Sequence, residues 1–134
     1  FKQVEKYIKE VHSRIKEEGF THYDAWYLVT NYGKQAEHIL ENYQNGKGND
    51  REERMILAEL EFGLDYECIL TPLDFFIRRT GRLYFDIESV RKFSEPVLDH
   101  FKKHLKTNKA QIDSWRDELN RELTRHSQFD LDRV

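Results

Sequence analysis

Two adjacent arginines in a short predicted helix carry the strongest chemical signal of the sequence. Asp74 precedes Arg78 by four residues, the spacing of an ion pair on one face of a helix. Arg79 points to the aromatic side of the same helix, where a guanidinium is costly unless a carboxylate or carbonyl oxygens bind it. We expect Glu67 to be that partner, so that Arg79→Met is tolerated better than Glu67→Ala. The alternative is that the two arginines hold a phosphate or an acidic group of another domain.

The other residue types that could do chemistry do not assemble into a site. The Gly-Lys-Gly triplet at 46–48 is followed by Arg51 where a dinucleotide fingerprint needs its third glycine, and no Gly-Lys-Ser/Thr loop occurs. His100 and His104 have a metal-binding spacing, but the residues between them favour a half-solvated helix flank. Cys68 has apolar neighbours, and we expect an inert, buried thiol. The sequence thus predicts no catalytic residue, no cofactor-binding residue and no metal ligand.

Length and composition favour a single folded domain. The 134 residues include 9 Phe, 7 Tyr and 2 Trp, and so many large rings argue against disorder. The net charge of −3 gives no electrostatic basis for binding nucleic acid or an anionic membrane. One cysteine excludes an internal disulfide and is typical of a reducing compartment, so we expect a cytoplasmic protein. The chain begins without Met or a signal peptide, and we expect it to be a piece of a longer protein.

Apolar residues recur at helical spacing along most of the chain, with capping signals between the runs. The predicted helices cover 1–15, 25–32, 36–43, 55–64, 75–80, about 86–105 and 112–123. Gly19 is the expected C-terminal cap of the first, and the expected N-terminal caps are the capping box Thr21–Asp24 for 25–32, Asn49 or Asp50 for 55–64, Thr71-Pro72 for 75–80 and Asn108 for 112–123. Pro96 is expected to kink the 86–105 helix or to divide it in two. The tail from Ser127 is expected to fray. No strand pair is evident, so we predict an all-α domain over 1–134, an irregular bundle of about six to seven helices.

The stretch from Asp74 to Thr80, closed by Gly81-Arg82-Leu83-Tyr84-Phe85-Asp86, resembles a known signature. The signature is Asp-x-x-x-Arg-Arg-Thr, from the C-terminal helical domain of FAD-dependent glycerol-3-phosphate dehydrogenases and α-glycerophosphate oxidases. Residues 25–33 and 59–72 resemble two further segments of that domain, and the similarity covers roughly 20–122. The 81–85 segment is closer to the Gram-positive-type enzymes than to the mitochondrial form, which leaves the electron acceptor open between quinone and oxygen.

The resemblance implies a parent enzyme that oxidises sn-glycerol 3-phosphate to dihydroxyacetone phosphate and uses FAD. In that family the flavin and substrate sites lie in N-terminal domains, so this chain is expected to be an accessory domain without a cofactor of its own. Its partners would be the N-terminal flavin and substrate domains of the same chain. A homodimer and a parent at the inner face of the cell membrane also fit the resemblance. Asp74, Arg78, Arg79, Thr80 and Glu67 are then motif residues with a structural or interdomain role.

Two other classes of function compete with this interpretation. A free-standing helical interaction module could share the same short motifs, and a flavin-binding sequence upstream in the gene would decide between the two. A helix-turn-helix DNA binder is disfavoured by the acidic balance and the lack of a basic stripe. If the chain is an enzyme domain, exposed aromatics such as Trp26, Tyr27, Phe75 and Phe76 are expected to form an orphaned apolar interface.

Overall fold

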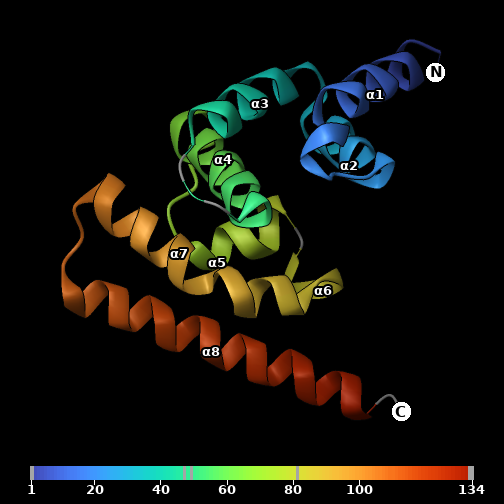
Figure 1. The fold of residues 1–134 in the computed structure, drawn as a ribbon. Helices are drawn as coiled ribbons and strands as arrows, with labels where there is room; N and C mark the ends of the chain where they lie inside the picture. The colour runs from blue at the N-terminus through green and yellow to red at the C-terminus, as the bar shows by residue number, and fades with distance from the viewer. Residues whose placement is uncertain (1, 47, 49, 81, 133–134) are drawn as a thin grey trace.

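The structure is a computed structural model that describes residues 2–46, 48, 50–80 and 82–132; for residues 78, 79, 84, 85 and 128–132 it describes the backbone only. Within these ranges it is all-α, as predicted, with six helices of ten or more residues and no strand (Figure 1). The helices are α1 (Lys2–Ile15), α2 (His22–Tyr32), α3 (Ala36–Asn45), α4 (Arg51–Tyr66), α5 (Pro72–Asp74), α6 (Arg82–Phe85), α7 (Ile87–Leu105) and α8 (Lys109–Asp132), with a π-helical turn at Phe75–Arg79 and single 3₁₀ turns at Lys16–Glu18 and Gly33–Gln35.

Helix α4 lies between two groups of helices and contributes to the core of each (Figure 1). Met55, Ala58 and Phe62 face the core formed with α1, α2 and α3. Ile56 and Leu60 face the core formed with α5, α7 and α8. We call these two halves the N-terminal lobe and the C-terminal lobe. A residue of α4 that lies between the two apolar faces is therefore held at the junction of the lobes.

The capping residues that the sequence predicts lie at the ends of the helices, as expected. Gly19 has a φ of 95°, the left-handed conformation that glycine adopts without strain. Thr21 and Asp24 form a complete capping box at the start of α2. The Asp50 carboxylate accepts the backbone N–H groups of the first turn of α4, and Asn108 accepts the N–H of Gln111 at the start of α8. Local hydrogen bonding thus fixes where these helices begin.

Thr71 is the N-cap of α5, and its hydroxyl accepts the backbone N–H of Asp74 at 3.1 Å. Pro72 occupies the first helical position, where its missing N–H costs nothing. We expect Thr71→Ala to lower the free energy of unfolding by about 1 kcal/mol, the usual cost of removing a cap. Urea unfolding measures this loss, with Thr71→Ser as the control that keeps the hydroxyl. An unchanged urea midpoint for Thr71→Ala at constant m-value would contradict the prediction.

The helix after this cap differs from the expected α-helix over 75–80. Phe75–Arg79 form a π-helical turn in which the N–H of Thr80 donates to the carbonyl of Phe75 at 3.0 Å. The side chains of Phe75 and Phe76 are both fully buried in the core of the C-terminal lobe. The wider turn reduces the angle between neighbouring residues and lets both rings enter the core. The expectation that these two phenylalanines are exposed at an interface is therefore wrong.

Three other local expectations also need correction. Helix α7 continues through Pro96, so of the two predicted alternatives, a kink or two helices in sequence, the second is wrong. Helix α8 extends to Asp132, so the segment expected to fray is helical, and Arg91 donates a hydrogen bond to the Ser127 hydroxyl at its start. Cys68 is exposed with a φ of 54°, because the chain must turn sharply between α4 and α5 there. In the described part of the chain, no helix is long and apolar enough to cross a bilayer.

Candidate functional site

The buried carboxylate of Glu59 is the centre of the polar structure between the two lobes. Glu59 lies on α4 between the two apolar faces described above and has 0% of its surface exposed. Its Oε1 accepts a hydrogen bond from the Tyr32 hydroxyl of the N-terminal lobe at 2.9 Å. Its Oε2 accepts one from Nη2 of Arg82 at 3.0 Å. Both oxygens of a buried charge are thus bound, one by each lobe, as a desolvated carboxylate requires.

Arg82 enters this centre from the first position of α6. Its side chain is 15% exposed, its Nη1 lies 3.8 Å from Oδ2 of Asp86, and its guanidinium carbon lies 5.4 Å from the Tyr27 ring centroid. Burial lowers the pKa of the Arg82 guanidinium, but the charge and hydrogen bond of Glu59, together with Tyr27 and Asp86, raise it, and the pKa is raised overall. The Glu59–Arg82 pair joins α4 to the start of the α6–α7 segment.

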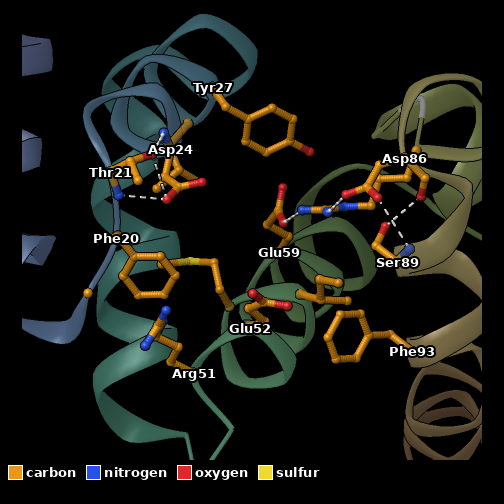
Figure 2. Close-up of a pocket in the computed structure, with 15 residues that line it drawn as sticks. Phe20, Thr21, Asp24, Tyr27, Arg51, Glu52, Glu59, Asp86, Ser89 and Phe93 are labelled. Atoms are coloured by element: carbon orange, nitrogen blue, oxygen red, sulfur yellow. Dashed lines mark hydrogen bonds and ion pairs between the residues drawn. The ribbon is translucent and has the colours of Figure 1, made fainter.

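A cavity of about 280 Å³ opens beside this ion pair, between α2, α4 and α7 (Figure 2). Its apolar lining comes from both lobes and from α4, and its polar lining includes the Glu59–Arg82 pair and the capping residues of α2 and α7. The lining residues are Gly19, Phe20, Thr21, Asp24, Tyr27, Leu28, Arg51, Glu52, Met55, Ile56, Glu59, Arg82, Asp86, Ser89 and Phe93. The cavity thus lies where the two lobes meet.

Of the motif residues read from the sequence, Thr80 lies next to this centre. Thr80 is 4% exposed, its hydroxyl donates to the carbonyl of Phe75 at 3.0 Å, and the same oxygen lies 3.4 Å from the backbone N–H of Arg82. This hydroxyl joins the end of the π-helical turn to the start of α6. The threonine of the motif therefore positions the backbone that carries Arg82.

Of the remaining motif residues, the structure describes Glu67 and Asp74 in full, but only the backbone of Arg78 and Arg79. Glu67 follows the last residue of α4 and is half-buried, and Asp74 is half-buried in α5. The side chains of Arg78 and Arg79 lie outside the described part of the structure. The expected pairing of Arg79 with Glu67, and the relative tolerance of Arg79→Met and Glu67→Ala, therefore stay predictions.

Sequence reasoning missed Glu59 and Arg82 as the residues of the centre. One signal was available, because Glu59 falls between a run of apolar residues facing one side of α4 and a second run facing another. A charged residue at that position must be paired when both faces are covered. Nothing in the sequence indicates that its partner is Arg82, which lies 23 residues further along the chain.

The described residues include no metal or nucleophile site. His100 and His104 stack with ring centroids 6.3 Å apart, and burial lowers the pKa of His100. No group of three His, Cys, Asp or Glu side chains among the described residues could hold a metal ion. The arrangement that the structure does build is an interlobe ion pair with an adjoining cavity. Such an arrangement can fix two groups of helices against each other and receive a polar group.

Comparison with known proteins decides the family. Residues 3–112 match the family described as the C-terminal domain of alpha-glycerophosphate oxidase. The chain belongs to this family. The resemblance read from the Asp74–Thr80 segment is therefore confirmed.

Full-length members of the family are much longer than this chain. The aerobic glycerol-3-phosphate dehydrogenase of Bacillus subtilis is 32% identical over 108 residues, which are 78% of this chain and 20% of that protein. The enzyme of the same name from Staphylococcus saprophyticus is 31% identical over 96 residues, 71% of this chain and 17% of that protein. The chain thus spans about a fifth of the length of these relatives.

A solved structure of a family member contains the same arrangement of helices. The crystal structure of glycerol-3-phosphate dehydrogenase from Bacillus halodurans, complexed with FAD, superposes with a TM-score of 0.78 at 28% identity. The match covers 91% of this chain and 25% of that protein. The all-α fold described above is therefore the fold of this family's domain.

Proposed function

We propose that this chain is the C-terminal helical domain of an FAD-dependent glycerol-3-phosphate dehydrogenase or oxidase. The observation that carries the proposal is the superposition with the Bacillus halodurans enzyme, because it covers nearly all of this chain but only a quarter of that FAD-bound protein. The parent enzyme would oxidise sn-glycerol 3-phosphate to dihydroxyacetone phosphate. FAD would supply the hydride-accepting chemistry, and electrons would pass on to quinone or oxygen.

The residues of this chain do not fit FAD. A flavin dinucleotide is held by backbone N–H groups of a glycine-rich turn between a strand and a helix. The described residues contain no strand, and their glycines do not have the required spacing. The carboxylates of the cavity beside Arg82 would also repel a pyrophosphate. We therefore assign the domain an accessory role, packed on the N-terminal flavin and substrate domains of the same chain.

The finer parts of the proposal concern the parent enzyme as a whole. We place it in the cytoplasm, at the inner face of the cell membrane, because quinone is held in the membrane. A homodimer is part of the same proposal. Light scattering of the parent and its distribution between membrane and supernatant fractions test these two points.

An accessory role predicts that the purified chain is colourless and does not turn over. We expect no flavin absorbance near 450 nm, no FAD binding and no oxidation of glycerol 3-phosphate with quinone analogues or oxygen, because no phosphate-binding turn is available. The Bacillus subtilis relative, assayed in parallel, is the positive control. A yellow chain with bound flavin, or turnover above the buffer control, would contradict the proposal. A gene that encodes no flavin domain beside this segment would favour the free-standing interaction module.

A further inference from the structure

The turn between α7 and α8 concentrates positive charge on a chain that is acidic as a whole. Its four lysines are all exposed: Lys102, Lys103, Lys106 and Lys109. Residues 100–112 contain these four of the chain's 22 basic residues and none of its 25 acidic residues. We call residues 102–109 the basic corner. The corner lies at one edge of the molecule, far from α1 and α2 (Figure 1).

Little of the positive charge of the basic corner is compensated within the chain. Lys103 forms an ion pair with Asp99 at 3.2 Å, but both side chains are exposed and water screens the pair. Among the described residues, no ion pair is formed by the other three, Lys102, Lys106 and Lys109. These three ammonium groups are therefore available to anions outside the chain.

The stability of the two helices does not account for all four lysines. A positive charge stabilises the C-terminal end of a helix, which explains Lys102 and Lys103 in the last turn of α7. The same dipole disfavours a positive charge at Lys109, because it is the first residue of α8. Lys106 has a φ of 54° and a ψ of 41°, a left-handed conformation that glycine or asparagine adopts more readily. Two of the lysines thus lie where local structure favours another residue.

An exposed leucine lies among these lysines. Leu105 follows the buried Phe101 by one turn, so it extends the apolar face of α7 beyond the core. Its side chain is 43% exposed, and Lys102 lies on the same face three residues earlier. An apolar side chain surrounded by lysines suits an anionic bilayer, where the lysines bind headgroups and the leucine enters the acyl boundary. A nucleic acid would use the lysines but leave the leucine in water.

We propose that the basic corner binds the anionic surface of a lipid bilayer. The net charge of −3 predicted no attraction to such a surface. Salt screens charges beyond about 10 Å at 0.1 M, however, so a bilayer that contacts the corner is attracted by its lysines and hardly repelled by the acids of the other helices. The role of this contact, to hold the parent enzyme at the membrane, rests on the proposed function.

Co-sedimentation with lipid vesicles tests the corner on the chain itself. The partition coefficient is measured with vesicles of phosphatidylcholine containing about one third phosphatidylglycerol, and with pure phosphatidylcholine as the uncharged control. We expect binding to the anionic vesicles that high salt abolishes. The double variant Lys102→Gln, Lys106→Gln should weaken it about twentyfold, since each lysine near the surface contributes about fivefold. Leu105→Ala should weaken it about fivefold through the lost apolar contact.

The double variant Lys6→Gln, Lys9→Gln is the matched control, because it removes the same charge from exposed positions of α1. Equal losses in the two double variants, or equal binding to charged and uncharged vesicles, would overturn the proposal. Binding to duplex DNA as tight as to the anionic vesicles, with no loss for Leu105→Ala, would also overturn it and assign the corner to nucleic acid. A parent enzyme found only in the supernatant fraction would instead count against the membrane location in the proposed function, while the vesicles still decide whether the corner binds lipid.

Discussion

Arg82→Met is expected to lower the free energy of unfolding by about 3–5 kcal/mol, the usual cost of leaving one partner of a buried ion pair without the other. Glu59 is fully buried, and its Oε2 is bound by Nη2 of Arg82. Methionine fills much of the same volume but cannot donate a hydrogen bond. Urea unfolding followed by circular dichroism measures the loss.

Two further variants separate the ion pair from general packing. Arg116→Met removes a half-exposed arginine that pairs with Glu95 and Asp113, and we expect little change because water and salt screen these pairs. The double variant Glu59→Leu with Arg82→Met should recover much of the stability lost in Arg82→Met, since it leaves no buried charge unpaired. If Arg82→Met and Arg116→Met lost the same small amount, Glu59–Arg82 would not hold the lobes together.

Phe75→Ala is expected to cost about 3–5 kcal/mol, the range for truncating a fully buried phenylalanine. The ring is 0% exposed in the C-terminal core and packs edge-to-face on Phe76 with centroids 5.3 Å apart. Phe75 also begins the π-helical turn, and its carbonyl accepts hydrogen bonds from the backbone N–H and the hydroxyl of Thr80. Thermal and urea unfolding measure the loss, with the exposed Leu70→Ala as control. A loss below that of Leu70→Ala would mean that the aromatic residues of the motif face a partner and not the core.

The helices and their first residues could be predicted because the signals for them are local. Thr21 and Asp24, or Thr71 and Pro72, lie within three residues of the groups they cap, so their hydrogen bonds follow from spacing alone. The class and the family followed from periodicity and from the Asp74–Thr80 segment. The exposure of individual residues was less predictable. Cys68 is followed by the apolar Ile69 and Leu70 yet is exposed, and it lies in the turn between α4 and α5.

The candidate site could not be predicted because it depends on contacts between distant segments. Glu59 is bound by Tyr32, 27 residues earlier, and by Arg82, 23 residues later. The motif indicated Arg78 and Arg79 as site residues. The ion pair that the structure describes is formed by Arg82, just after the motif. Thr80 connects the two, since its hydroxyl joins the π-helical turn to the backbone of Arg82. The end of the 75–80 segment thus helps to place Arg82 at the junction of the lobes.

The most direct test of the account is the activity of an exchange enzyme, in which this chain replaces the matching C-terminal segment of the Bacillus subtilis relative. The Bacillus subtilis relative is prepared intact, without its matching C-terminal segment, and with that segment replaced by this chain, and FAD content and glycerol 3-phosphate oxidation are measured for each. The account predicts that the exchange enzyme keeps FAD and oxidises glycerol 3-phosphate well above the shortened enzyme, because the helical fold of this chain is that of the family's domain. An exchange enzyme that is folded and helical, but no better than the shortened enzyme in FAD content and turnover, would contradict it.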